Sequence, residues 1–319
     1  MPTEGAPRGS RIPAIDLTRG AALVGMALYH LSWDLAYFRI IPGAFPVDPP
    51  MRLFSHLVAG AFLTLAGVSL ALAHSTGVNW PRFLRRLAVI GAAAALVTLA
   101  TRAFAPEQAI YFGILHCIAL ASILALLSVS APPWVPLALA AFAFAAPLFL
   151  VSRWFDAIGL VWIGLSTWTP TTLDWRPLLP WSGFVLLGLG AARMAPKGLL
   201  SSPPARWRPA AAPWRALTWA GRRSLAIYLA HQPILFGALF AVTALTGLDD
   251  KLNAEAFAAT CQSQCRAGGG APQFCAEACQ CVVSGLQNAN LSIALSREAL
   301  SDAQREGYSR IVRSCSAAR

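Results

Sequence analysis

Long apolar runs alternate with short polar segments along the first 246 residues of the chain. A transmembrane α-helix needs roughly 20 mostly apolar residues to cross a bilayer. Seven runs approach that length, and they cover residues 20–38, 54–73, 87–102, 110–129, 133–151, 178–193 and 224–246. The pattern predicts an all-α polytopic membrane protein with about seven transmembrane helices. The apolar stretch 157–165 is too short to cross, and we interpret it as a re-entrant or interfacial segment.

Composition supports this interpretation. Of the 319 residues, 56% are hydrophobic and only 12% are charged, whereas about a quarter of an ordinary soluble protein is charged. The numbers exclude an ordinary soluble enzyme and a disordered chain. The 23 prolines and 24 glycines fit transmembrane helices, which tolerate both residue types.

The basic residues are distributed unevenly over the loops between the predicted spans. Thirteen lie on one side, at Arg8, Arg11, Arg19, Arg82, Arg85, Arg86, Arg193, Lys197, Arg206, Arg208, Arg215, Arg222 and Arg223. Five lie on the other side, at Arg39, Arg52, Arg102, Arg153 and Arg176. The positive-inside rule places the N-terminus in the cytoplasm of a bacterial inner membrane, and seven crossings place the C-terminal tail in the periplasm. The excess positive charge faces the anionic leaflet, and no motif for nucleic acid accompanies it.

The chain changes character after residue 248. Residues 1–248 form the predicted transmembrane domain, and residues 249–319 form a cysteine-rich helical tail. The tail holds six of the seven cysteines, at Cys261, Cys265, Cys275, Cys279, Cys281 and Cys315. Two C-x3-C pairs each place two cysteines on one helical face. They favour a helical hairpin stapled by two disulfides, with residues 267–272 as its turn and Cys281–Cys315 as a third bridge. Six cysteines allow 15 pairings, and a four-thiolate zinc site is the alternative.

Several ionisable residues fall inside the predicted spans, where each is a functional candidate because of its insertion cost. His30 lies roughly 15 Å along the first span, and Asp34 follows at i+4 on the same helical face. A carboxylate there can orient the imidazole as a general base. His116 lies at a similar depth in the fourth span, and we expect it to converge with this pair. A purely structural interhelical contact is the alternative for all three residues.

Polar residues at the cytoplasmic end of the first span offer a second type of site. Asp16 and Arg19 can cap and anchor the helix. Together with the basic segment before the seventh span, they can also bind a ligand that carries phosphate. The chain contains no G-x-x-x-x-G-K-[ST], G-x-S-x-G or H-E-x-x-H motif, so an ATPase, a serine hydrolase or a zincin receives no support, and no metal site is expected.

Four segments in order carry a resemblance to a known family. They are IDLTRGAALVGMALYHLSWDL, YFGILHCIALASILALL, LLPWSGFVLLGLGAAR and GRRSLAIYLAHQP. Residues 11 to about 246 resemble the bacterial heparan-alpha-glucosaminide N-acetyltransferase-like membrane proteins, within the wider transmembrane acyltransferases.

The resemblance implies an acyltransferase that takes an acetyl group from cytoplasmic acetyl-CoA and delivers it to a sugar or another acceptor at or across the membrane. It implies no tightly bound cofactor, and a homodimer is left open. His30, Asp34 and His116 are the expected catalytic residues. The expected substrate and CoA contacts are Asp16, Arg19, Arg222, Arg223, Tyr228, His231 and Gln232.

Three other functions remain open from the residues alone. A transporter could use the intramembrane histidines as a proton relay, although no inverted repeat is visible. A membrane haem protein could use two histidines as axial ligands. A non-catalytic scaffold could recruit a partner through its tail.

Overall fold

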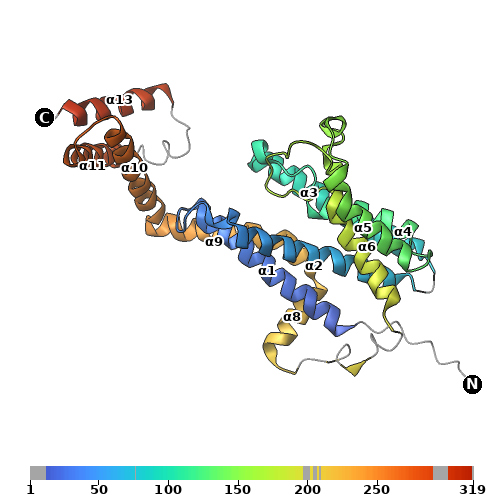
Figure 1. The fold of residues 1–319 in the computed structure, drawn as a ribbon. Helices are drawn as coiled ribbons and strands as arrows, with labels where there is room; N and C mark the ends of the chain where they lie inside the picture. The colour runs from blue at the N-terminus through green and yellow to red at the C-terminus, as the bar shows by residue number, and fades with distance from the viewer. Residues whose placement is uncertain are drawn as a thin grey trace, which may run out of the picture. The chain divides into compact units, whose positions relative to one another are not determined.

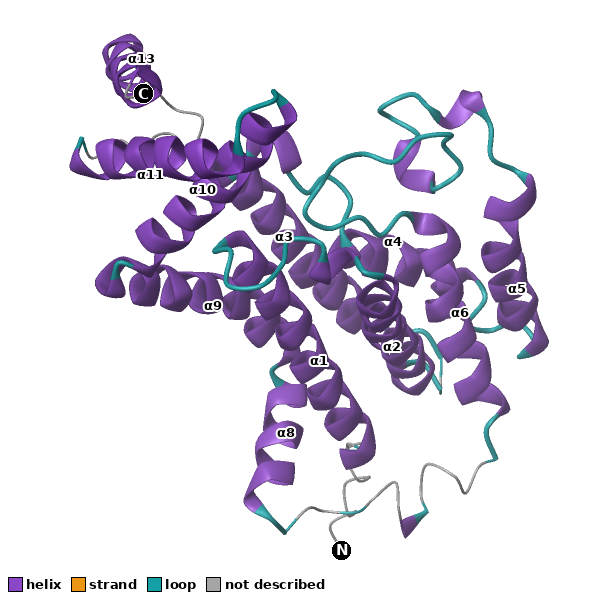
Figure 2. Ribbon diagram, turned by 60° about the vertical axis from the view of Figure 1, so that its left-hand side comes forward, coloured by secondary structure: helices purple, strands orange, loops and turns teal. Residues whose placement is uncertain are grey.

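All regular structure in the described part of the chain is helical. The computed structural model describes residues 12–75, 77–196, 202–203, 207, 210–289 and 301–317, and within these residues there is no strand (Figures 1 and 2). The chain divides into two compact units, which we describe separately. The first comprises Met1–Tyr29 with Pro49–Gln232, and the second comprises His30–Asp48 with Pro233–Arg319. The arginines and lysine counted at positions 8, 11, 197, 206 and 208 lie outside the described residues.

Each of the seven predicted apolar runs coincides with a helix. These are α1 (Pro13–Tyr37), α2 (Pro49–Ala73), α3 (Trp80–Phe104), α4 (Ile114–Leu127), α5 (Trp134–Phe149), α6 (Leu178–Met194) and α9 (Ser224–Thr246). In the described residues, α2, α3 and α9 are long and apolar enough to cross a membrane, whereas α4, α5 and α6 are shorter apolar helices. The all-α membrane architecture therefore agrees with the sequence, while the number of seven crossings stays a prediction.

The core of the first unit is built around α6. This helix packs against α2, α5 and α4, as both ribbon views show (Figures 1 and 2). Leu63, Val185 and Leu189 are fully buried in this core. Glycine permits the close approach of α2 and α6, because a Cβ atom at Gly67 or Gly188 would overlap backbone oxygen of the facing helix.

The segment predicted to be re-entrant lies in an irregular connection between α5 and α6. Its regular structure consists of two single 3-10 turns, Arg153–Phe155 and Val161–Ile163. The carboxylate of Asp156 accepts hydrogen bonds of 2.8 Å from the Ser166 hydroxyl and from the amide and hydroxyl of Thr167. These bonds lower the pKa of Asp156, the Thr167 amide most strongly, and they close the connection on itself. Residues 157–165 therefore form a loop whose two ends are joined by the hydrogen bonds of Asp156.

The second unit contains the cysteine-rich tail. Its helices are α10 (Leu248–Ala267), α11 (Pro272–Asn288) and α13 (Asp302–Ala317). Cys261–Cys279 and Cys265–Cys275 staple α10 to α11, and Cys281–Cys315 ties α13 to α11. The predicted stapled hairpin and the predicted third bridge are confirmed. Since disulfides use all six thiols of the tail, the zinc alternative is wrong.

A turn at Gly247 lies next to the predicted boundary between the two domains. The chain turns from α9 to α10 at Gly247, which adopts a left-handed conformation with φ of 64°. The predicted boundary at residues 248 and 249 adjoins this turn. The two compact units divide the chain differently, because parts of α1 and α9 belong to each of them. The predicted division into domains 1–248 and 249–319 stays a prediction.

Candidate active site

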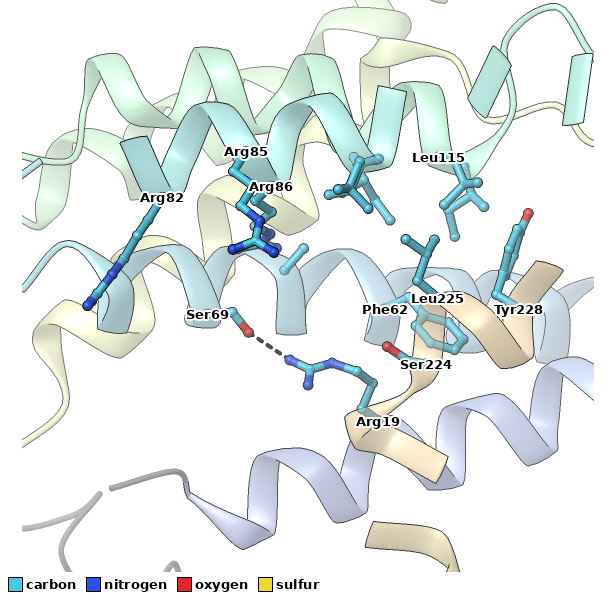
Figure 3. Close-up of a pocket in the computed structure, with 15 residues that line it drawn as sticks. Arg19, Phe62, Ser69, Arg82, Arg85, Arg86, Leu115, Ser224, Leu225 and Tyr228 are labelled. Carbon is cyan, nitrogen blue, oxygen red and sulfur yellow. Dashed lines mark hydrogen bonds between the residues drawn. The ribbon is translucent and has the colours of Figure 1, made fainter. Parts of the chain in front are cut away.

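A cavity of about 510 Å³ opens in the first unit. Its walls come from the first half of α1, from α2, α3 and α4, and from the start of α9 (Figure 3). One part of the lining is apolar and includes Phe62, Ile90 and Leu115. The other part is basic and is formed by Arg19, Arg82, Arg85 and Arg86. None of the described residues that line the cavity is acidic, so its chemistry suits a ligand with both an anionic and an apolar portion.

Three of the four arginines come from the first two turns of α3. The helix begins at Trp80 rather than at residue 87, because the Asn79 side chain accepts a 3.1 Å hydrogen bond from the amide of Arg82. Arg82, Arg85 and Arg86 are thus spaced i, i+3 and i+4 on one helical face. Figure 3 shows Arg85 and Arg86 extending from α3 toward the side from which Arg19 approaches.

Cations at this end of a helix are unfavourable for the helix itself. The N-terminus already carries the positive end of the macrodipole, and a like charge there costs roughly 0.3–1 kcal/mol. The first turn of α3 contains no acidic residue that offsets it. Arg19 and Arg86 also repel each other across the cavity. In the described part of the chain, no carboxylate lies within ion-pair distance of Arg82, Arg85 or Arg86. A bound anion would relieve this concentration of positive charge.

Arg19 is held in place from two sides. Its guanidinium donates a 3.3 Å hydrogen bond to the Asp16 carboxylate and a 2.8 Å bond to the Ser69 hydroxyl (dashed in Figure 3). Asp16 is buried and also accepts a 3.3 Å bond from Arg222. Arg222 is the last residue of α8 (Ala212–Arg222). One carboxylate thus links α1 to α8 and positions Arg19 toward the cavity.

Only some of the other predicted substrate contacts line the cavity. Tyr228 lines the cavity directly. His231 lies one turn further along α9, where its Nδ1 donates a 2.6 Å hydrogen bond to the Tyr228 carbonyl, and Gln232 follows it. Arg223 is not among the described lining residues, and its guanidinium instead stacks over the Trp219 ring at 4.6 Å. Of these predicted contacts, Arg19 and Tyr228 line the cavity, and Asp16 and Arg222 are linked to Arg19 by hydrogen bonds.

His116 is occupied by local hydrogen bonds. Its Nδ1 accepts a 3.2 Å bond from the amide of Gly113, at the start of α4. The neutral ring therefore carries its proton on Nε2, which donates to the Thr98 hydroxyl at 3.3 Å. Thr98 in turn donates to the carbonyl of Ile110 at 2.7 Å. This arrangement caps α4 and joins it to α3, and the catalytic role of His116 stays a prediction.

Loop residues complete the anchoring of α4. The Asp174 carboxylate accepts a 2.7 Å bond from the amide of Ile114. Arg176 lies 3.9 Å from Asp174, donates to the Ser55 hydroxyl at 2.8 Å, and stacks over the Trp181 ring at 4.7 Å. This polar cluster fixes the connection before α6 to the start of α4.

His30 and Asp34 belong to the second unit. Because α1 is one continuous helix, the two residues share a helical face one turn apart, as their spacing predicts. Asp34 is only 3% exposed, and His30 is half-buried. The predicted convergence of this pair with His116 stays a prediction.

Sequence reasoning missed the three arginines of α3 as site residues. They entered the argument only as cytoplasmic charges, because the apolar run begins after them. Their R-x-x-R-R spacing was the available signal, since it places all three on one face of a helix.

The sequence model described as "Heparan-alpha-glucosaminide N-acetyltransferase, catalytic" matches residues 11–233. The chain belongs to this family of acetyltransferases. The match contains all the described residues that line the arginine-rich cavity, and it ends at Pro233, within α9 and before the cysteine-rich tail. No curated protein and no solved structure matches the chain. This membership confirms the family resemblance that the four sequence segments indicated.

Proposed function

We propose that this protein is an integral membrane acetyltransferase whose donor is acetyl-CoA. The observation that carries the proposal is the cavity lined by Arg19, Arg82, Arg85 and Arg86 on one side and by apolar residues on the other. CoA combines phosphate groups with a less polar pantetheine arm and an acyl thioester. Guanidinium groups bind phosphate oxygens in charge-assisted, often bidentate hydrogen bonds. The basic wall would hold the phosphates, and the apolar wall would receive the acyl-bearing arm.

The proposed orientation follows from the loop charges and from the tail. The arginines of α3 lie at the end of that helix on the more basic side of the predicted spans, which the positive-inside rule assigns to the cytoplasm, where acetyl-CoA is present. The three disulfides of the tail suit an oxidising compartment such as the bacterial periplasm. These two independent features support a cytoplasmic donor side and an external tail.

The proposed chemistry is transfer of the acetyl group to an amine or hydroxyl, carried by a sugar or another acceptor. The amine nitrogen or hydroxyl oxygen of the acceptor would attack the thioester carbonyl carbon, while His30 removes the proton from that atom. Asp34, one turn away, would orient the imidazole and stabilise its protonated form. The carbon–sulfur bond then breaks, and CoA leaves as a thiolate that takes up a proton. His116 would contribute by holding the start of α4, whose residues Ile114 and Leu115 line the cavity.

Release of the CoA thiol tests the proposal. Full-length protein in liposomes is given acetyl-CoA and a panel of amino sugars, with His30→Ala beside the wild type. Loss of a general base lowers the rate by about 10²–10⁴-fold. His56→Ala is the matched control, because His56 is exposed and lies outside the cavity lining, and it is expected to retain activity. Turnover that persists unchanged in folded His30→Ala would remove His30 from the mechanism. Flux of a solute without thiol release in the wild type would favour the transporter.

A further inference from the structure

Helix α8 has two chemically different faces. Thr218 and Gly221 are buried on one of them. A Cβ atom at Gly221 would overlap the backbone oxygen of Asp16, and one at Gly20 would overlap that of Leu217. This close approach of backbones holds α8 firmly against α1 and fixes which residues face outward.

The opposite face carries a basic and aromatic stripe. Arg215, Trp219 and Arg223 follow one another at i, i+4 and i+8, which places them on the same side of the helix. Trp219 is 53% exposed, and the two arginines are exposed as well. The Arg223 guanidinium lies 4.6 Å above the Trp219 ring, so cation and indole form one surface. Residues 211–223 contain no acidic residue that would neutralise it.

The position of this stripe in the chain relates it to the membrane. Arg223 immediately precedes Ser224, the first residue of α9, which is long and apolar enough to span a bilayer. A helix that ends where a span begins lies at the boundary between water and lipid. Tryptophan and arginine are the residues favoured at that boundary. If α9 crosses the bilayer, this position would present the stripe to lipid headgroups.

We propose that the stripe Arg215–Trp219–Arg223 is a binding site for anionic phospholipid. The two guanidinium groups would bind headgroup phosphate, and the indole would lie at the level of the headgroups with its ring toward the acyl chains. The cytoplasmic leaflet is negatively charged, which complements a face without acidic residues. The proposal does not depend on acetyl transfer, because Arg215, Trp219 and Arg223 are not among the described residues that line the cavity.

Native mass spectrometry of the full chain in neutral detergent tests the site. The protein is titrated with dioctanoyl phosphatidylglycerol and, separately, with dioctanoyl phosphatidylcholine. We expect wild-type protein to prefer phosphatidylglycerol. Each basic residue near an anionic surface contributes about 1 kcal/mol, or about fivefold in affinity. The double variant Arg215→Gln/Arg223→Gln should lose at least fivefold of the preference, while Arg215→Lys/Arg223→Lys should keep most of it.

Two arms decide the interpretation. Arg102→Gln/Arg153→Gln removes the same charge from exposed positions on other elements and should leave the preference unchanged. An equal loss in this control would mean that net charge alone attracts the lipid, which overturns the site. Glycerol 3-phosphate is added as a competitor at the same concentration as the lipid. If glycerol 3-phosphate displaces most of the bound phosphatidylglycerol at this equal concentration, the stripe binds soluble phosphate and the proposal is wrong.

Discussion

His74 is buried although it lies in a connection between two helices. It lies directly after α2, in a connection where a histidine is usually solvated, yet it is only 7% exposed. Its Nδ1 accepts a 3.2 Å hydrogen bond from the amide of Asn79, the residue that caps α3. The buried ring thus supports the start of the helix that carries the three cavity arginines.

Burial lowers the pKa of His74 below its ordinary value of 6.5. The folded state then binds a proton on His74 less readily than the unfolded state does. The contribution of the neutral, buried His74 ring to the free energy of unfolding is therefore fully present above about pH 6.5 and is lost as the pH falls. We predict that the melting temperature of the purified protein drops between about pH 7.5 and 5.5, and that it drops less in His74→Gln. Equal slopes for the two proteins would show that His74 does not titrate with unfolding.

The site residues differ in how far the sequence could predict them. The sequence indicated a polar site at Asp16 and Arg19, because a charged pair at the end of an apolar helix is costly to bury, and Arg19 does line the cavity. Contact of the two residues with a ligand stays a prediction. The local role of His116 was not predictable, since its partners Thr98 and Gly113 are fixed by the way α4 turns back on α3. Arg86 was overlooked because only packing shows that it faces Arg19 rather than open solvent.

At the scale of elements, apolar length predicted where helices lie but not where they begin. The runs marked the apolar part of each helix and left out polar first turns, as in α3, whose capping residue Asn79 precedes three arginines. The disulfide hairpin was predictable because two cysteines four residues apart share a helical face. Which cysteine of one pair bonds to which of the other depends on the antiparallel packing of α10 and α11, which joins Cys261 to Cys279 and Cys265 to Cys275.

The crossing of α1 and α8 depends on glycine. We predict that Gly221→Ala lowers the free energy of unfolding by about 1–3 kcal/mol, because the new methyl group overlaps the Asp16 backbone oxygen. Thermal unfolding in detergent measures the effect. Gly91→Ala is the matched control, since nothing lies within 4 Å of its Cβ position in the interior of α3, and it should be neutral or stabilising by up to about 1 kcal/mol. Equal destabilisation of both variants would contradict the close crossing.

At the scale of the whole molecule, the loop charges and the cysteines make one prediction about orientation. Alkaline phosphatase is active only outside the cytoplasm. We predict that its fusion after residue 317 is active, because the proposed topology places the disulfide-bonded tail outside the cytoplasm. Its fusion at residue 131, in the short connection between α4 and α5, should be inactive because the proposed topology places that connection in the cytoplasm. The reverse pattern would invert the topology and remove the cytoplasmic donor site.

The central claim is that the arginine-lined cavity binds the acetyl-CoA donor, and equilibrium binding to the purified full-length protein tests it most directly. We predict saturable binding by the wild type and at least tenfold weaker binding by Arg86→Gln. A hydrogen bond to a charged group contributes about 1.5–3 kcal/mol, and 1.4 kcal/mol is a factor of ten. Arg102→Gln, at the opposite end of α3, should bind like the wild type. Equal affinity of all three proteins, or no binding by any of them, would contradict the account.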